Sequence, residues 1–237
     1  MRKKNNIVWI TGASSGIGKA LVAEFAKNNV YVLGSARRLN LLNEIKKELG
    51  KQGKYFIPHK LDVTDFPGAK AKYSEISKHY RIECLINNAG ITSFSLASKD
   101  NSNTVEKVVR TNLIAPINIS QLVLKGMRRR KEGTIINILS VAAEKVFVRS
   151  SVYSAAKAGL LAYMKVLREE IREYNVKIVN VLPGATKTGI WPRDMLKKSG
   201  DRMMLPGDIA KLIYLIYNMN SSAVPEEIVL RPIQGDL

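Results

Sequence analysis

The sequence predicts one α/β domain built on a doubly wound parallel sheet with helices on both faces. Short runs rich in β-branched and apolar residues alternate with amphipathic helical segments along the whole chain of 237 residues. A glycine-rich turn follows the first of these runs, where a strand would lead into a helix. Such alternation indicates right-handed strand–helix–strand crossovers and a parallel sheet covered on both faces. A ligand should then bind beyond the carboxyl ends of the strands.

The individual elements follow from hydrophobic periodicity. Runs with strand character span residues 7–11, 30–35, 55–61, 82–87, 134–139, 177–182 and 227–230. Segments with helical periodicity span residues 16–28, 41–49, 67–79, 104–127, 152–174 and 208–218. No linker and no internal repeat interrupts the pattern, so residues 1–237 are expected to form a single domain.

The net charge of +18 is high for a chain of this size. Two interpretations stay open: a lysine-rich solvated surface, or a surface for an anionic partner such as a nucleic acid, a membrane or an acidic carrier protein. Lysine and arginine are spread over the chain, with one dense stretch at residues 125–131. No nucleic-acid motif accompanies them, so we expect no nucleic-acid binding. The dense stretch either stabilises the end of a helix or docks an acidic acyl carrier protein.

Cysteine usage and hydropathy exclude several classes of protein. Cys84 is the only cysteine, which rules out an intrachain disulfide and a cysteine-based zinc site and suits a cytoplasmic protein. No run approaches the ~18 apolar residues of a membrane span, so no membrane insertion is expected. No cluster of His, Cys and Asp has metal-ligand spacing, and we predict no metal.

A candidate dinucleotide site lies where the first predicted strand turns into the first helix. The residues there are Thr11, Gly12, Ala13, Ser14, Ser15, Gly16, Ile17 and Gly18. The glycines permit a tight turn and let backbone amides approach a pyrophosphate at the helix N-terminus. Their spacing differs from the general G-x-G-x-x-G fingerprint, and a plain strand–helix turn is the alternative.

The end of the second predicted strand indicates which dinucleotide is bound. An NAD site places an acid ~20 residues beyond the glycine-rich turn, where it binds the ribose 2′-hydroxyl. Here Arg37 and Arg38 occupy that region, and no acid lies between Glu24 and Glu44. Guanidinium groups suit a 2′-phosphate, so we predict NADP(H), with Arg37 as the first phosphate ligand and Arg38 and Ser14 or Ser15 assisting. The alternative is that both arginines begin a solvated helix.

Polar residues recur near the ends of later strands. Asn88, Ala89 and Gly90 follow the run at residues 82–87, and asparagines there can cap backbone groups and line a cofactor cleft. Asn112 lies inside the predicted helix at residues 104–127, where asparagine has a poor helix propensity. Its side chain is expected to bond a backbone group or to kink the helix.

Ser140, Tyr153 and Lys157 form the candidate catalytic group. Tyr153 and Lys157 stand one helical turn apart on one face, although taken alone they could be a surface pair. Lowering the tyrosine pKa of ~10 by about 2–3 requires ~3–4 kcal/mol. An ammonium about 4 Å away at an effective dielectric near 20 supplies a stabilisation of that order. We therefore expect Lys157 to depress the pKa of Tyr153 and make it a general acid/base.

In the order and spacing of these motifs the chain resembles the short-chain dehydrogenase/reductase family. The resemblance covers about residue 7 to about residue 231 and adds Pro183-Gly184 to the motifs above. It implies a Rossmann fold and an oxidoreductase that moves hydride between NADP(H) and a carbonyl or secondary alcohol, as a ketone or aldehyde reductase. It also implies a homodimer or homotetramer that meets through the helices at residues 104–127 and 152–174.

The resemblance assigns a role to each site residue. Tyr153 would protonate the carbonyl oxygen, and Ser140 would hydrogen-bond it. Lys157 would hold the nicotinamide ribose, and Asn112 would support a water relay. The further cofactor contacts are Asp62 and Val63 at the adenine, Asn88, Ala89 and Gly90 beside the cofactor, and Pro183, Gly184, Thr186 and Thr188 at the carboxamide. Thr186 departs from the family, in which a branched aliphatic residue is commoner.

The segment at residues 188–205 is predicted to be the substrate loop. Its apolar residues Ile190, Trp191, Met195, Met203 and Met204 either line a pocket or belong to a short helix packed on the core. Phe94, Val141, Ala142 and Phe147 would complete the wall. Two other functions stay open: a 3-oxoacyl-acyl-carrier-protein reductase, and a non-catalytic NADP(H)-sensing protein.

Overall fold

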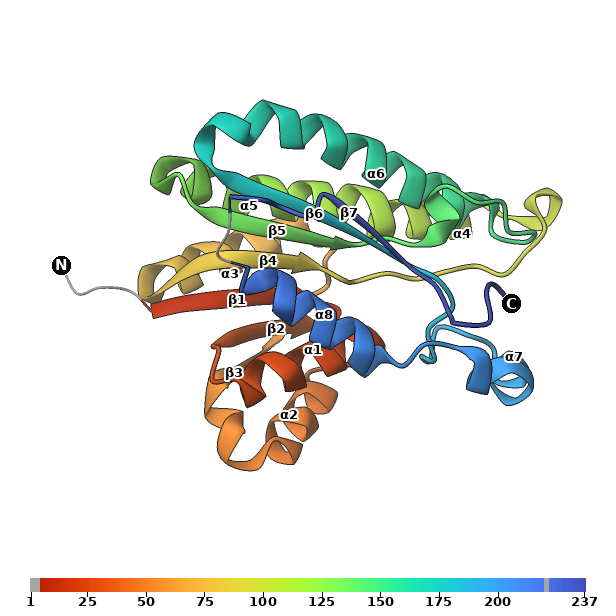
Figure 1. The fold of residues 1–237 in the computed structure, drawn as a ribbon, viewed down its shortest axis with the longest axis horizontal. Helices are drawn as coiled ribbons and strands as arrows, with labels where there is room; N and C mark the ends of the chain where they lie inside the picture. The colour runs from red at the N-terminus through yellow and green to blue at the C-terminus, as the bar shows by residue number, and fades with distance from the viewer. Residues whose placement is uncertain (1–4, 220–221) are drawn as a thin grey trace.

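The predicted fold class is confirmed by a computed structural model, which describes residues 5–219 and 222–237. Its sheet has seven parallel strands in the order β3-β2-β1-β4-β5-β6-β7 (Figure 1). The strands are β1 (Asn5–Thr11), β2 (Val32–Ala36), β3 (Phe56–Lys60), β4 (Tyr80–Asn87), β5 (Gly133–Ile138), β6 (Val176–Pro183) and β7 (Glu227–Leu230). The strand order reverses between β1 and β4, and doubly wound sheets bind ligands beside such a reversal.

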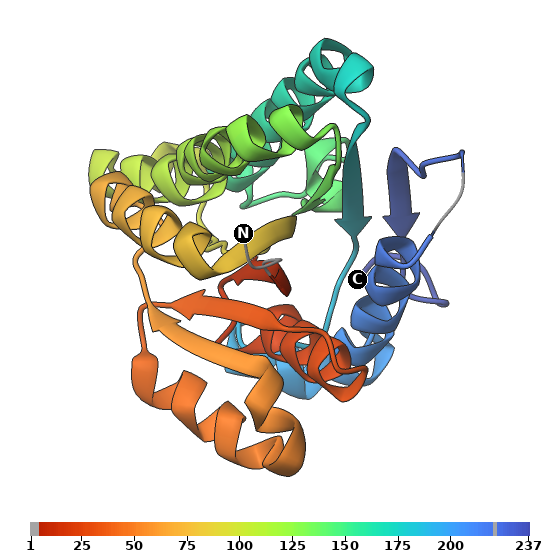
Figure 2. The same cartoon turned by 90° about the vertical axis from the view of Figure 1, so that its left-hand side faces the viewer.

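Helices cover both faces of the sheet (Figure 2). They are α1 (Gly16–Lys27), α2 (Leu39–Glu48), α3 (Phe66–His79), α4 (Ser102–Val109), α5 (Ala115–Arg130), α6 (Ser151–Ile171), α7 (Arg193–Ser199) and α8 (Pro206–Tyr217). In β1, Ile7 and Trp9 pack with α3, α5 and α6, whereas Val8 and Ile10 pack with α1, α2 and α8. Because successive strand side chains point to opposite faces, an unbroken apolar run fills both cores. No helix in the described ranges is both long and apolar enough to cross a membrane.

The predicted helix at residues 104–127 is interrupted, which corrects that expectation. α4 ends at Val109, a π-helical turn spans Arg110–Ile114, and α5 begins at Ala115. Pro116 has no N–H to donate to the carbonyl of Asn112, and its ring crowds that carbonyl, so regular helix geometry is lost there. The helix predicted at residues 152–174 likewise ends in α6 at Ile171, with a 3₁₀ turn over Arg172–Tyr174.

A row of buried amides crosses the middle of the sheet. Asn87 of β4, Asn137 of β5 and Asn180 of β6 stand in register. Asn87 donates to the Asn137 side-chain oxygen at 2.9 Å, and Asn137 donates to that of Asn180 at 3.0 Å. Asn87 also donates to the Ser120 hydroxyl of α5 at 2.9 Å. Such a paired polar row fixes the register of β4, β5 and β6, whose carboxyl ends form the site.

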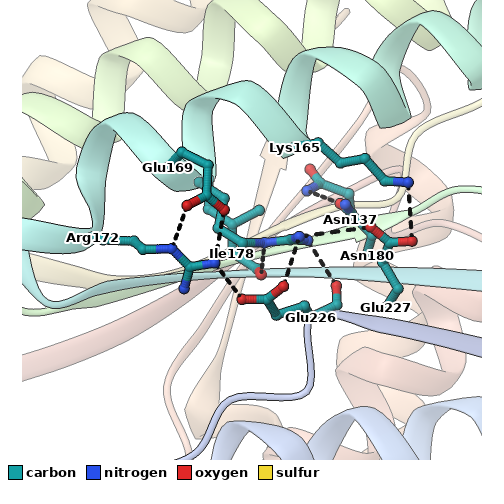
Figure 3. Close-up of polar contacts among 9 residues, drawn as sticks. Asn137, Lys165, Glu169, Arg172, Ile178, Asn180, Glu226 and Glu227 are labelled. Atoms are coloured by element: carbon teal, nitrogen blue, oxygen red, sulfur yellow. Dashed lines mark hydrogen bonds and ion pairs between the residues drawn. The ribbon is translucent and has the colours of Figure 1, made fainter.

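The far half of α6 is clamped to β6 and to the start of β7. Arg168 is buried and donates to the carbonyls of Ile178 at 3.2 Å and Glu226 at 2.9 Å. Arg172 bridges Glu169 and Glu226 beside it (Figure 3). This clamp holds the helix whose other end carries Tyr153 and Lys157.

Candidate active site

A cavity of about 1040 Å³ lies at the carboxyl ends of the strands. Ser140, Tyr153 and Lys157 line it, and so do the predicted cofactor residues Gly12, Ser14, Ser15, Gly16, Ile17, Arg37, Arg38, Asp62, Val63, Asn88, Ala89, Gly90, Pro183, Gly184, Thr186 and Thr188. Gly18 and Asn112 do not line it; both stand directly behind its wall. The fold therefore brings the separately predicted motifs to one place.

The glycine-rich turn and the segment after β4 brace each other. The Thr11 hydroxyl accepts hydrogen bonds from the backbone amides of Asn88 at 3.0 Å and Ala89 at 3.1 Å. The Asn88 side chain donates back to the carbonyls of Thr11 at 2.9 Å and Gly12 at 3.1 Å. Gly12 has φ +67°, and a Cβ there would stand 2.7 Å from Ala89 Cα. Glycine at position 12 thus lets the two segments pack closely, and the cavity beside them is lined by residues at the start of α1, which fits a pyrophosphate.

Gly18 acts on this cradle from behind. A Cβ at Gly18 would lie 2.2 Å from the Gly12 carbonyl oxygen and 2.6 Å from the Asn88 side-chain nitrogen. The residue thus permits close packing of α1 on β1. It supports the cradle without lining the cavity.

Arg37 and Arg38 are exposed at the end of β2 and line the cavity. Neither guanidinium makes a hydrogen bond or an ion pair with the described part of the chain. Asp62, after β3, is oriented by the backbone amide and hydroxyl of Thr64, which donate to it at 3.0 and 2.7 Å. Two unpaired guanidinium groups beside the cradle suit an anion such as a 2′-phosphate.

Ser140, Tyr153 and Lys157 meet between the end of β5 and the start of α6. Ser140 lies just after the end of β5. Its hydroxyl oxygen accepts a hydrogen bond from the Ala142 amide at 3.1 Å, and the hydroxyl contacts the Tyr153 phenol. Lys157 is 4% exposed, and its Nζ donates to the Ile138 carbonyl at 2.8 Å. The same Nζ lies 5.7 Å from the centre of the Tyr153 ring. A hydroxyl, a phenol and an ammonium therefore share one corner of the cavity.

Asn112 lies behind this corner, in the π-helical turn. Its side-chain nitrogen donates to the carbonyls of Ile91 at 2.8 Å and Val108 at 3.0 Å, and its oxygen accepts from the Ile91 amide at 3.2 Å. The predicted backbone bonding and helix irregularity at this residue are both present. A Cβ on Gly90 would lie 2.9 Å from the Asn112 oxygen and 3.8 Å from Lys157 Nζ, so these three residues are neighbours.

The pKa values correct the sequence argument about Tyr153. Burial raises the pKa of the Tyr153 phenol, and its hydrogen bond with Ser140 only partly opposes that rise. Burial also lowers the pKa of Lys157 to about 8. Attraction between phenolate and ammonium favours the two charges, but both groups lose hydration in the folded chain, and that loss opposes both charges. The net shift of the Tyr153 pKa is upward, opposite in sign to the depression expected from Lys157, so the phenol is protonated at neutral pH.

The side of the cavity beyond Tyr153 is mainly apolar. Phe94 and Trp191 stack with ring centroids 5.3 Å apart, and the Trp191 indole donates to the Thr186 carbonyl at 2.9 Å. The other predicted wall residues that line the cavity are Val141, Ala142, Phe147, Ile190 and Met195. The segment at residues 188–205 lines the cavity, as the first interpretation expects. It also contains a short helix, α7, but this helix has no buried residue, so the expectation of a helix packed on the core is wrong.

Met203 and Met204 do not line the cavity, which corrects their assignment as pocket residues. Met203 is 6% exposed, and Met204 pairs with Thr186 in an isolated parallel bridge. The cavity instead includes Arg149, Asp236 and Leu237, which the sequence analysis did not identify. Arg149 lies just before α6, outside the helix that carries Tyr153, so helical spacing does not indicate it. Nothing in the sequence connects residues 236–237 with Tyr153.

Known proteins are similar to the chain in sequence and fold. The family model described as short chain dehydrogenase matches residues 6–198. Sepiapterin reductase of Chlorobaculum tepidum is 34% identical over 98% of both chains. The 3-oxoacyl-[acyl-carrier-protein] reductase of Thermotoga maritima is 30% identical over 97% of both chains. A solved metagenomic short-chain oxidoreductase in complex with NADP has a TM-score of 0.84 at 26% identity, over 97% of each chain.

Proposed function

The chain belongs to the short-chain dehydrogenase family of oxidoreductases, and we propose that it is an NADP(H)-dependent reductase of ketones or aldehydes. One observation carries the proposal: a single cavity joins two unpaired guanidinium groups at the end of β2 to the Ser140, Tyr153 and Lys157 group at the end of β5. The first end suits a 2′-phosphate, and the second suits proton transfer to a carbonyl oxygen.

NADP(H) fits the residues at the cofactor end. The glycine cradle would hold the pyrophosphate, Arg37 and Arg38 the 2′-phosphate, and Asp62 and Val63 the adenine. The contacts near the nicotinamide would come from Asn88, Ala89, Gly90, Lys157, Pro183, Gly184, Thr186 and Thr188. The absence of an acid after β2 and the NADP-bound relative at 26% identity support this choice over NAD. When bound, the nicotinamide supplies hydride.

The protein's own groups manage the proton. Tyr153 donates its phenolic proton to the carbonyl oxygen, and the Ser140 hydroxyl holds that oxygen in place. Lys157 binds the ribose and presents a positive charge to the phenol. Asn112, through its bonds to Ile91 and its position beside Gly90, keeps the wall next to Lys157 in place. The raised pKa of Tyr153 keeps the phenol protonated, which suits the reductive direction.

The assay that tests this function incubates the purified protein with NADPH and a panel of ketones and aldehydes. Loss of reduced nicotinamide that depends on a carbonyl compound is the expected result. No turnover with any carbonyl, while NADPH still binds, would instead favour the alternative of a non-catalytic NADP(H)-sensing protein. Retention of both Tyr153 and Lys157 argues against that alternative.

Carrier-linked substrates are the second candidate. The Thermotoga maritima relative is named as a 3-oxoacyl-[acyl-carrier-protein] reductase, and the chain has a basic stretch at residues 125–131. In the structure Arg128 donates to the Tyr174 hydroxyl at 2.8 Å and Arg130 to the Ile82 carbonyl at 2.9 Å, so part of this stretch has structural partners. The test measures the rate of reduction at rising salt concentration. Inhibition with carrier-linked substrates but not with small substrates would favour this candidate.

The pH dependence should follow the two shifted groups. We expect kcat/KM for carbonyl reduction to be constant through neutrality, because Tyr153 stays protonated and Lys157 stays charged below a pH of about 8. Above that pH, loss of the Lys157 ammonium should lower reduction. Alcohol oxidation needs both the phenolate and the ammonium, so it should rise up to a pH of about 8 and level off above it. The Lys157→Arg variant keeps its positive charge at high pH, so its kcat/KM for reduction should not fall above a pH of about 8. A rate of reduction that already falls with rising pH below pH 7 would contradict this assignment. So would a rate of oxidation that falls with rising pH.

We further expect a homodimer or homotetramer that meets through α5 and α6. Val166 on α6 is 60% exposed and Ile114, just before α5, is 41% exposed, so this face presents apolar side chains. Val166→Glu should shift the protein toward smaller species. Size-exclusion chromatography with light scattering checks both statements, and a monomeric wild type would refute them.

A further inference from the structure

Arg149 has a backbone conformation that is unfavourable for a long side chain. Its φ is +70°, in the left-handed region. The other non-glycine residues with positive φ in the described ranges are Asn29, Lys131 and Asn175, and each follows the end of a helical segment, where this conformation is common. Arg149 instead precedes α6 and lines the cavity. It stands at the third position of a turn from Phe147 to Ser150, and turn positions with this conformation usually hold glycine or asparagine, so an arginine here is uncommon.

The charge of Arg149 is also placed against local preference. α6 is a helix of 21 residues with no acid in its first turn, and a cation beside the positive end of a helix is disfavoured. An acid at this end, Asp100, accepts a hydrogen bond from the Ser151 hydroxyl at 3.0 Å. No hydrogen bond or ion pair joins the Arg149 side chain to any residue that the structure describes.

Hydrogen bonds keep the Arg149 backbone in place. Its carbonyl accepts from the Ser95 amide at 3.1 Å, which ties it to the wall segment that carries Phe94. On its other side the Ser150 amide donates to the Phe147 carbonyl at 3.2 Å. The arginine is therefore held between two parts of the substrate wall.

The other charges at this end of the cavity have partners. Asp236 is paired with Arg231 and with Lys145 at 3.3 Å, and Lys157 is bonded to the Ile138 carbonyl. Arg37 and Arg38 stand at the end of β2, about 14 Å away from β5 when three strand spacings are counted. Arg149 is thus an exposed cation that lines the same cavity as Tyr153 and has no counter-charge among the described residues, and it lies on a different segment from the arginines assigned to the cofactor.

We propose that Arg149 binds an anionic oxygen group of the carbonyl substrate, a carboxylate or a phosphate. The inference rests on the proposed function and names its substrate class: oxo acids or phosphorylated carbonyl compounds. A bound anion compensates both the guanidinium charge and the positive end of α6. The apolar wall around Phe94 and Trp191 contacts the rest of the substrate.

The test compares anionic carbonyl compounds with neutral counterparts: acetoacetate with methyl acetoacetate, levulinate with methyl levulinate, and dihydroxyacetone phosphate with dihydroxyacetone. We expect wild type to prefer the anionic member of at least one pair. Arg149→Gly removes the guanidinium and accepts the left-handed backbone, so it should lower kcat/KM for that member about tenfold or more. The kcat/KM for the neutral member and the thermal unfolding midpoint should not fall, and the NADPH Kd should not rise.

The matched control is Lys131→Gly. Lys131 also has a left-handed backbone conformation and lies outside the cavity, so this variant should leave kcat/KM unchanged for both members of each pair. The inference is overturned if wild type prefers the neutral member of every pair. It is also overturned if Arg149→Gly lowers kcat/KM equally for the anionic and the neutral member. Either result leaves the reductase function standing. A preference for acetoacetate or levulinate indicates that Arg149 binds a carboxylate, and a preference for dihydroxyacetone phosphate indicates that it binds a phosphate.

Failure of the reductase function itself would appear as no NADPH consumption with these compounds or with the wider carbonyl panel. Binding is then measured through the fluorescence of bound NADPH during titration with acetoacetate and with dihydroxyacetone phosphate. Weaker binding of either one by Arg149→Gly than by wild type supports the anion site. Equal binding, or none, overturns it.

Discussion

Tyr153→Phe is expected to lower kcat for carbonyl reduction by about 10²–10⁴-fold, the usual contribution of a positioned general acid. The substitution removes the phenolic proton and the contact with Ser140 but keeps the ring beside Lys157. The NADPH Kd should change little, because the hydroxyl serves the substrate oxygen rather than the phosphates. Steady-state kinetics and fluorescence titration of NADPH measure the two effects separately.

The matched control is Tyr163→Phe on the same helix. The Tyr163 hydroxyl accepts from the Gln121 side chain at 3.4 Å and lies outside the cavity. We expect this variant to keep wild-type kcat. Undiminished turnover by Tyr153→Phe, or an equal loss in Tyr163→Phe, would remove Tyr153 from the mechanism.

Arg37→Ala is expected to weaken NADPH binding about tenfold or more and to leave NADH binding nearly unchanged. The reason is that only NADPH carries a 2′-phosphate, and the unpaired guanidinium at the end of β2 loses no protein partner when it is removed. Arg38→Ala should show the same selectivity with a smaller loss. Titration of both reduced cofactors, at fixed salt, measures the ratio.

Arg110→Ala serves as the control for net charge. Arg110 pairs with Glu106 at 2.7 Å, and both side chains are exposed and outside the cavity. Its loss should alter neither cofactor's Kd. If Arg37→Ala weakens the binding of NADPH and NADH equally, the residue stabilises the turn and does not bind the 2′-phosphate.

The architecture was predictable from local signals. Every predicted strand is present, with ends that differ by at most two residues, because apolar β-branched runs have few alternatives in a sheet buried on both faces. The cofactor end was equally readable, since the glycine-rich turn, the arginines after β2 and Asn88 each act close to their own strand ends. Pro116 also gave a local signal for the break after α4.

The substrate end depends on contacts between distant segments, which local patterns do not report. The raised pKa of Tyr153 arises from burial by the assembled cavity wall. α7 has no buried residue and hence no periodic apolar stripe from which to predict it. Asp236 reaches the cavity through pairing with Arg231 and Lys145, a combination that only the fold creates.

Transfer of hydride from NADPH to a carbonyl carbon is the central claim, and isotope tracing tests it most directly. NADPH deuterated at the transferable position of the nicotinamide is incubated with the wild-type protein and the carbonyl panel, and the alcohol products are analysed by mass spectrometry. The predicted result is an alcohol that carries one deuterium on the former carbonyl carbon. Consumption of NADPH without a deuterated alcohol, or no alcohol from any carbonyl compound, would contradict it.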